Sequence, residues 1–307
     1  MPSTKGFFGE TIDIFQRLCF ARVRTRDKLR IFGVLFWQLI SKAIRKRISA
    51  SLDEKIEGIT EKLWRGSVIE VDGIKYALLD FESFMIVSSL CAKFESFMPL
   101  WLKPRRGEVL VDIGAHIGKY TLTTAKVVGN EGMVVALEPH PVNYQTLQRN
   151  IRLNKLENAV ALNLAAWNTD CELKLFTGDA AGHHSVKVNR RIGWVEVKAR
   201  VTDHVLKELR LDRVDWIKID VEGAEREVLC GLEETISKYK PKIITEVFYE
   251  SVHARTQNVD EMKKFMKEHG YGLIRISPFF EDFVMFTSIP FSHKHAVSIK
   301  NKHETVG

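Results

Sequence analysis

The sequence predicts an α/β fold built on a mostly parallel, seven-stranded sheet with helices on both faces. From residue 109 onward, short apolar runs alternate with segments of helical apolar spacing, as in successive strand-helix-strand units. Residues 109–111 are apolar without alternation, which is typical of a strand covered on both faces. Hydrophobic residues make up 45% of the 307 residues, which is enough for a packed core.

The first strand of this sheet leads into a turn that contains two glycines. Residues 109–120, VLVDIGAHIGKY, predict a buried strand, a turn and the start of a helix. Gly114 and Gly118 give the backbone conformational freedom and let a ligand approach the main chain. In an open α/β sheet, such a unit is where a nucleotide-like ligand binds. The residues that we expect to line this site are Asp112, Gly114, Ala115, His116 and Gly118.

The spacing of the glycines separates three classes of ligand. A dinucleotide fingerprint needs G-x-G-x-x-G, but its second and third glycine places hold His116 and Lys119. A phosphate loop needs four residues between its glycines, and only three intervene here. The remaining pattern, D-x-G-x-x-x-G, favours a cofactor with a nucleoside end, an amino-acid end and no phosphates, namely S-adenosylmethionine.

The second strand supports the same ligand. Residues 133–138 are an apolar run that ends in Glu138 and is followed by Pro139. Glu138 lies 20 residues after Gly118, and an acid at about that distance accepts hydrogen bonds from a ribose diol. The alternative is a solvated loop carboxylate.

The remaining elements follow in chain order. We expect further strands at 160–164, 216–220, 242–247, 271–276 and 283–287, and helices at 119–127, 142–154 and 259–269. Residues 172–176 and 195–201 interrupt this alternation and predict an inserted hairpin. The polar loop between them, 177–191, is a suitable place for a lid that faces the substrate.

The chain before the sheet divides into two parts. Residues 67–79 predict a hairpin that turns at Asp72-Gly73, and residues 83–102 predict a helix that ends before Pro104. The predicted organisation is a basic amphipathic helical extension, a cap, a core domain and a polar, disordered tail. Their boundaries are 1–60, 61–108, 109–288 and 289–307.

The net charge of +7 is concentrated in the extension, because residues 1–50 alone carry +8. This distribution disfavours a basic nucleic-acid groove across the fold. Residues 29–48 have helical apolar spacing between basic clusters. One interpretation is a helix on an anionic membrane surface, and the other is a helix docked on the domain or on a second copy of the chain.

The cellular setting is predicted from what the sequence lacks. The four cysteines form no C-x-x-C pair, so neither metal binding nor redox use is expected and a reducing compartment fits. The first apolar stretch does not resemble a signal peptide. The longest apolar run, 31–37, is far shorter than the roughly 20 residues of a membrane span. We therefore expect a cytoplasmic protein, peripheral to the membrane if residues 29–48 bind it.

Carboxylates also follow the later strands. In the segment 218–225, KIDVEGAE, Asp220 ends a buried strand, at the same sheet edge as Asp112 and Glu138. Such carboxylates suit hydrogen bonding to hydroxyls, removal of a proton, or binding of a cation. Glu222 and Glu225 share a face if a helix begins near Glu222; alternatively, they only complement the positive end of that helix.

Two further groups are candidates for chemistry. Glu246 ends the next strand, so Asp220 and Glu246 are candidate ligands for a divalent cation such as Mg²⁺; the alternative, which we favour, is hydrogen bonding without a metal. His184, in the inserted loop, is a candidate general base, and its alternative is a solvated histidine.

Together these residues resemble the FkbM family of S-adenosylmethionine-dependent methyltransferases. The resemblance covers roughly 94–286 and depends on four motifs: 111–118, Glu138-Pro139, Asn150 and 217–225. It implies a Rossmann-like class I methyltransferase fold and O-methylation of a sugar or other small-molecule hydroxyl. By the same resemblance Asp112 and the turn hold the methionine end and Glu138 the ribose, and Asn163 and Ala165 lie near the adenine. The implied general bases, in order, are Asp220, Glu222 and His184.

Two other functions remain open from the sequence. The first is an RNA or protein methyltransferase that uses the basic extension as a tether, which predicts salt-sensitive RNA binding. The second is a non-catalytic scaffold that binds the cofactor without transferring a methyl group.

Overall fold

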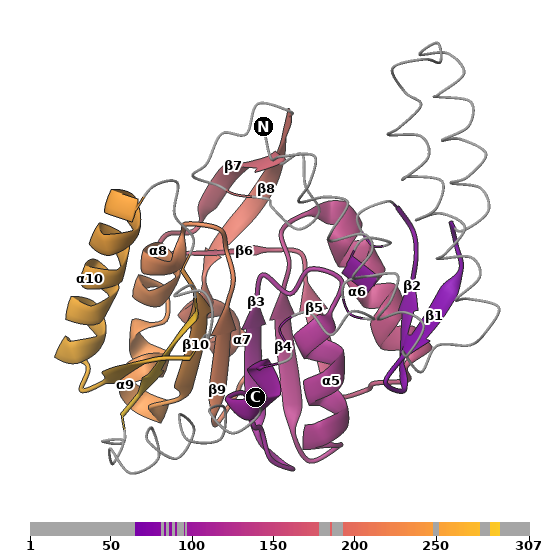
Figure 1. The fold of residues 1–307 in the computed structure, drawn as a ribbon, viewed down its shortest axis with the longest axis horizontal. Coiled ribbons are helices and arrows are strands. Elements are labelled where there is room, and N and C mark those ends of the chain that lie inside the picture. Colours follow the sequence, from indigo (N-terminus) through magenta and orange to yellow (C-terminus); the bar gives the residue numbers. More distant parts are fainter. Residues whose placement is uncertain are drawn as a thin grey trace, which may run out of the picture.

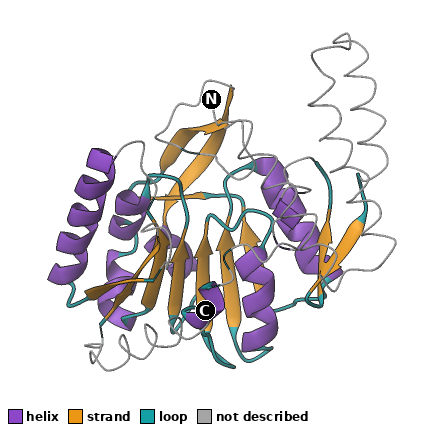
Figure 2. Ribbon diagram, viewed as in Figure 1, coloured by secondary structure: helices purple, strands orange, loops and turns teal. Residues whose placement is uncertain are grey.

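The fold is described here from a computed structural model of the chain (Figures 1 and 2). It describes residues 65–80, 83, 86–87, 90, 95, 97–177, 185, 193–247, 252–276 and 283–288, with the backbone alone over 252–258. The extension 1–60 with its stretch 29–48, the loop residue His184 and the tail 289–307 lie outside these ranges, so the predictions about them remain predictions.

A seven-stranded sheet forms the centre of the molecule (Figure 2). Its strand order is β11-β12-β10-β9-β3-β4-β5. Their bounds are Val109–Ile113 (β3), Met133–Leu137 (β4), Ala159–Leu162 (β5), Trp216–Ile219 (β9), Lys242–Glu246 (β10), Gly272–Arg275 (β11) and Phe283–Thr287 (β12). The run from β10 to β5 is parallel, and β11 and β12 add an antiparallel edge. The predicted mostly parallel, seven-stranded sheet is therefore confirmed.

Helices cover both faces of this sheet (Figure 1). Successive side chains of a strand point to opposite faces, and β3 and β4 are buried along almost their whole length, so both faces must be covered. Val111 and Val135 pack in one cluster with the side chains of four helices: α7 (Thr202–Glu208), α8 (Glu225–Cys230), α9 (Glu233–Tyr239) and α10 (Val252–Glu268). Leu110, Val134 and Ala136 face the other side, where α5 (Lys119–Val128) and α6 (Pro141–Leu153) pack. The buried apolar side chains on both faces hold the strands in place, and with them the residues at the strand ends.

The insertion after β5 forms a second, smaller sheet. Its strands are β6 (Ala165–Trp167), β7 (Cys171–Thr177) and β8 (Gly193–Val201), with β8 in the middle. β7 and β8 are antiparallel, which confirms the predicted hairpin. Three elements were not predicted, β6, α7 and α9, because each is too short for a periodic pattern to develop.

The predicted N-terminal hairpin is also confirmed. β1 (Val68–Val71) and β2 (Ile74–Ala77) pair antiparallel around Asp72 and Gly73, which both have positive φ, as a type I′ turn requires. Asn150 of α6 ties this hairpin to the glycine turn. Its Oδ1 accepts the Ala77 N–H at 2.7 Å, and its Nδ2 donates to the Ile117 carbonyl at 2.8 Å.

The predicted helix over 83–102 is wrong in its second half. Residues 98–100 form a 3-10 helix, η1 (Met98–Leu100), with Pro99 in its first turn. Glu95 has a φ of 55°, which a continuing α-helix does not allow. This change of direction brings the Glu95 side chain toward α5, with consequences described below.

Within the described ranges, no helix is both long and apolar enough to cross a membrane.

Candidate functional site

Four neighbouring strands end in carboxylates at one edge of the sheet. Asp112 lies in β3, Glu138 follows β4, Asp220 follows β9 and Glu246 ends β10. Because these strands are parallel and adjacent, their carboxyl ends meet at the edge where open α/β sheets bind ligands. The sequence predicted this shared edge for all four residues.

The turn after β3 depends on Gly114. Its φ is +73°, and a Cβ at this position would lie 1.8 Å from the carbonyl oxygen of Asp220. The backbone N–H groups of Gly114 and Ala115 both donate to the Leu137 carbonyl, at 3.0 and 3.1 Å. The glycine therefore lets the ends of three strands approach closely, and Gly118, with φ +100°, then begins α5.

Replacing Gly114 by Ala is expected to lower the free energy of unfolding by about 3 kcal/mol, because the new methyl group overlaps a backbone oxygen. Gly66→Ala is the matched control. Gly66 has a similar φ of +78° but no atom within 4 Å of its added Cβ, so only the conformational cost of about 1 kcal/mol applies. Urea unfolding of both variants checks this, and equal losses would contradict the steric explanation.

Glu138 connects the turns after β3 and β4. Its side chain is buried, with 5% exposed, and its Oε2 accepts the His116 N–H at 2.8 Å while Oε1 accepts the His140 N–H at 2.9 Å. His116 has a φ of 52°, a conformation in which histidine, like asparagine, is enriched. A carboxylate oxygen can accept more than one hydrogen bond, so this is the type of group that can bind a ligand hydroxyl.

Asn163 extends this connection to the end of β5. Its Nδ2 donates to the carbonyls of Glu138 and Pro139, at 2.9 and 2.8 Å. Asn163 thus lies beside the predicted ribose contact. Ala165 lies in β6, and its buried side chain packs in the apolar cluster of the small sheet. The predicted adenine contact of these two residues remains a prediction.

A buried lysine joins Asp112 to Asp220. Lys218 is 3% exposed, and its Nζ lies 3.0 Å from Asp220 Oδ2 and 3.9 Å from Asp112 Oδ1. Burial lowers the pKa of Lys218, but the charges of Asp220 and Asp112 outweigh burial and raise it above its ordinary value. Lys218 therefore stays charged at neutral pH and holds Asp220 in place at the sheet edge.

Asp112 lies inside the fold, directly beneath the turn. Its Oδ2 accepts the Thr121 hydroxyl at 2.6 Å, whereas its Oδ1 is buried and has no hydrogen bond within the described part of the chain. A buried carboxylate oxygen without a donor is uncommon and marks a place for a ligand donor or water.

Glu246 is neutral at physiological pH. Burial and the nearby charges of Asp220, Glu95 and Glu222 raise its pKa to about 10. It therefore presents a carboxylic acid, which can donate a hydrogen bond, next to the ionisable Asp220.

This shift predicts how stability depends on pH. Between the ordinary pKa of 4.5 and about 10, Glu246 is protonated in the folded chain and ionised in the unfolded chain. Unfolding then releases a proton, so the contribution of Glu246 to stability falls as pH rises. We expect Glu246→Gln to gain stability relative to the wild type between pH 5 and pH 9, measured by urea unfolding. A difference between the two proteins that does not change with pH would contradict this.

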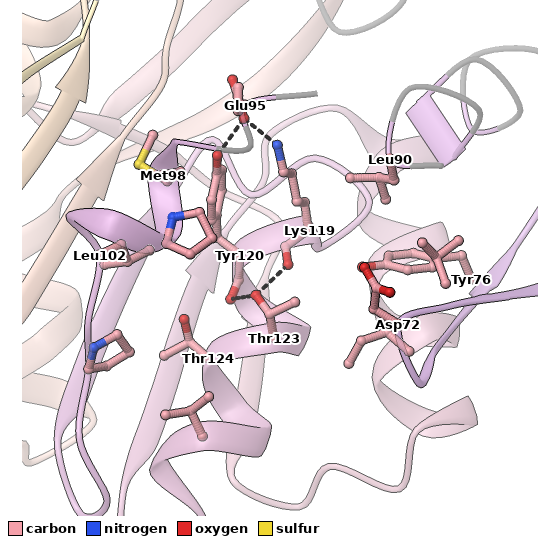
Figure 3. A pocket seen from close by; sticks show the side chains of 15 residues that line it. Asp72, Tyr76, Leu90, Glu95, Met98, Leu102, Lys119, Tyr120, Thr123 and Thr124 are labelled. Atoms are coloured by element: carbon pink, nitrogen blue, oxygen red, sulfur yellow. Dashed lines mark hydrogen bonds and ion pairs between the residues drawn. The ribbon is translucent and has the colours of Figure 1, made fainter. Parts of the chain in front are cut away.

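One cluster at this edge was not predicted from the sequence. Glu95 accepts hydrogen bonds from the Lys119 ammonium and the Tyr120 hydroxyl at the start of α5 (Figure 3). The Tyr120 ring lies 5.1 Å from Lys218 Nζ, so this cluster adjoins the one formed by Lys218. In the sequence, the only sign of this cluster is the lysine-tyrosine pair at 119–120, directly after the glycine turn. That pair does not show that Glu95 would be its partner.

The loop after β9 differs from the prediction. α8 begins at Glu225, so Glu222 precedes the helix and the two glutamates do not share a helix face. Glu225 is buried and accepts the Gly223 N–H at 2.8 Å, which closes the loop. Glu222 has a φ of 54°, and its backbone carbonyl accepts a hydrogen bond from the hydroxyl group of Ser185. Ser185 is a buried residue of the inserted loop.

No group of three or more His, Cys, Asp or Glu side chains is placed to hold a metal ion among the residues that the structure describes. Asp220 instead lies beside the Lys218 ammonium. The candidate cation site at Asp220 and Glu246 remains a prediction.

Comparisons with known proteins found a matching family model and several similar sequences. The model of the methyltransferase FkbM domain matches residues 112–273. Methyltransferase 1 of Beauveria bassiana is 31% identical over 147 residues, 41% of this chain and 58% of that protein. Methyltransferase sdnD of Sordaria araneosa is 29% identical over 171 residues, 45% of this chain and 66% of that protein. The chain thus spans about three fifths of the length of these relatives.

Two more distant similarities complete the comparison. Hexuronic acid methyltransferase AglP of Haloferax volcanii is 24% identical over 172 residues, 55% of this chain and 69% of that protein. The crystal structure of methyltransferase FkbM from Methylobacillus flagellatus is 20% identical and has a TM-score of 0.46, over 68% of this chain and 55% of that one.

The matched region begins at Asp112 and runs through the glycine turn, Glu138, the inserted hairpin, the loop after β9 and Glu246. It therefore contains every described residue that the sequence predicted for the site. The chain belongs to the FkbM methyltransferase family.

Proposed function

We propose that this chain transfers the methyl group of S-adenosylmethionine to a hydroxyl oxygen of a sugar or another small molecule. The observation that carries the proposal is the shared sheet edge, where Glu138 and Asp112 lie on either side of the glycine turn. Membership of the FkbM family supports the transfer of a methyl group. The name of the AglP relative, a hexuronic acid methyltransferase, supports a sugar as acceptor.

The residues at this edge fit the proposed cofactor. The buried Asp112 Oδ1, which lacks a hydrogen bond within the described chain, suits the ammonium of the methionine end. The buried carboxylate of Glu138, directly after β4, is the type of acceptor that suits the two ribose hydroxyls. Gly114 lets the turn pack directly against the Asp220 carbonyl, which brings the turn to the sheet edge where the ligand would bind.

The charge of the edge favours the same class of ligand. Asp220 and Glu246 lie at the ends of neighbouring parallel strands, and the charges of Asp220 and Glu222 contribute to the raised pKa of Glu246. Lys218 offsets only part of the negative charge of Asp112 and Asp220. Such a surface attracts a cationic sulfonium and repels a phosphate, which matches the absence of a phosphate-binding pattern in the sequence.

The proposed chemistry assigns one role to each group. When bound, S-adenosylmethionine would supply an electrophilic methyl group on a sulfonium centre. The acceptor oxygen would form a C–O bond to that methyl carbon as it loses its proton, while the C–S bond breaks and S-adenosylhomocysteine leaves. Asp220 is 28% exposed, and its carboxylate accepts that proton. Lys218 orients Asp220 through the 3.0 Å contact. Glu246, as a neutral acid, donates a hydrogen bond that orients the acceptor.

The experiment that tests this function uses methyl-labelled S-adenosylmethionine. The purified full-length chain is incubated with fractionated cell extract, and the label is followed into small molecules, glycans, RNA and protein. We expect acid-stable label on a glycan or small-molecule hydroxyl. Label confined to RNA or protein, or cofactor binding without any transfer, would overturn the proposed acceptor class.

A further inference from the structure

A cavity of about 380 Å³ lies beside the site, on the outer side of α5. The β1–β2 hairpin, one face of α5 and six residues of the segment between them line it (Figure 3): Leu90, Glu95, Met98, Pro99, Leu102 and Pro104. Its volume falls within the range of about 300–1,000 Å³ that is usual for small-molecule sites. The cavity is distinct from the glycine turn, although Lys119 and Tyr120, which follow the turn directly, form one of its ends.

The walls of this cavity are chiefly apolar. Ile74 of the hairpin, Met98 and Leu102 contribute side chains that are at least nine-tenths buried. In Figure 3, Met98 and Leu102 lie on one side of the cavity and Tyr76 lies on the other. The Thr123 hydroxyl donates to the carbonyls of Lys119 and Tyr120 within its own helix, so it offers no donor to a ligand.

Charged groups are arranged so that they do not favour an anionic occupant. Among the described residues that line the cavity, Lys119 is the only basic one, and Glu95 is its ion-pair partner. The other carboxylate is Asp72, which is exposed at the hairpin turn. An anionic group would therefore gain no unpaired cation here, whereas a neutral hydrocarbon chain would gain contact with the apolar walls.

The polar end of the cavity adjoins the side chains next to the proposed reaction centre. Tyr120 lines the cavity, and its ring lies 5.1 Å from the Lys218 ammonium, which contacts Asp220 at 3.0 Å. Glu95 lines the cavity too, and its charge contributes to the raised pKa of Glu246. Tyr120 therefore lies between the cavity and the ion pair of Lys218 with Asp220.

We propose that this cavity binds the neutral apolar tail of the methyl acceptor, so that the acceptor is an amphiphile with a hydroxyl-bearing head and a hydrocarbon tail. This inference rests on the proposed function, because that function places the hydroxyl at the sheet edge. The cavity then selects acceptors by their tails, and the groups around Asp220 act on the head.

The test fills the cavity from the exposed side of α5. Thr123 and Val127 are both exposed and line the cavity, so Thr123→Trp and Val127→Trp place an indole in it without disturbing the buried core. Val127→Thr, which has almost the same volume, is the control. The probe is N-phenyl-1-naphthylamine, a neutral apolar dye whose fluorescence rises in an apolar site. Dodecyl maltoside below its micelle concentration and free maltose serve as competitors with and without a tail.

We expect the wild type and Val127→Thr to bind the dye equally and both Trp variants to bind it at least about tenfold more weakly, a change of 1.4 kcal/mol. Dodecyl maltoside should displace the dye, and maltose should not. Failure of the wild type to bind the dye, unchanged dye affinity in both Trp variants, or displacement by maltose would each overturn the proposal.

A titration with S-adenosylmethionine separates this inference from the proposed function. All four proteins should bind the cofactor with equal affinity, because the substitutions lie outside the glycine turn. If none of them binds the cofactor, the proposed function fails whatever the dye shows. If all four proteins bind the cofactor but the dye experiment gives one of the contradicting results above, only the proposed binding of the acceptor's tail in the cavity is wrong.

Discussion

Replacing Asp220 by Asn is expected to lower turnover by about 10²–10⁴-fold, the usual contribution of a general base. Asn keeps the size of the side chain and still accepts the hydrogen bond from Lys218, which lies 3.0 Å away. It cannot take a proton from an acceptor hydroxyl. Affinity for S-adenosylmethionine should be largely retained, because Glu138 and the glycine turn are unchanged. The measurement is single-turnover methyl transfer together with calorimetric titration of the cofactor.

Asp212→Asn provides the matched control, since Asp212 is exposed and lies shortly before β9. It should turn over normally. Thermal unfolding of both variants shows whether a lost activity reflects lost structure. Near-normal turnover in a folded Asp220→Asn protein would remove Asp220 as the base and leave Glu222 or His184 as the next candidates.

Replacing Glu138 by Ala is expected to weaken S-adenosylmethionine binding by about 10²-fold. Hydrogen bonds to a charged group contribute about 1.5–3 kcal/mol each, and the proposed ribose contact uses this carboxylate. The substitution also removes the acceptor for the His116 and His140 N–H groups, so the turns after β3 and β4 lose their connection. Calorimetric titration of the purified variant measures the loss.

Glu131→Ala is the control for this experiment, because Glu131 lies just before the opposite end of β4 and is 67% exposed beside Arg106. Its affinity for the cofactor should equal that of the wild type. Glu138→Gln should give an intermediate affinity, because the amide keeps one acceptor oxygen. If Glu138→Ala binds the cofactor as well as the wild type, Glu138 does not belong to the site.

The sequence by itself determined the central sheet, the glycine turn and the edge at which the carboxylates lie. These features are local: apolar runs such as 109–113 and 133–137 predict buried strands, and an acid placed at the end of such a run must lie at the sheet edge. The spacing of Gly114 and Gly118 is local as well, so the sequence alone favours S-adenosylmethionine over a ligand bound by a phosphate loop.

Contacts between distant segments were decided only by the tertiary structure. Gly114 is required because the Asp220 carbonyl, over a hundred residues later, occupies the space of its Cβ. The ion pairs of Lys218, the position of Glu95 against Tyr120 and the neutral state of Glu246 depend on which side chains share a buried volume. A pattern along the chain shows which residues reach the edge of the sheet. Burial and charge act through space, however, so the packing of the strands and helices decides which of these residues meet there and in which protonation state.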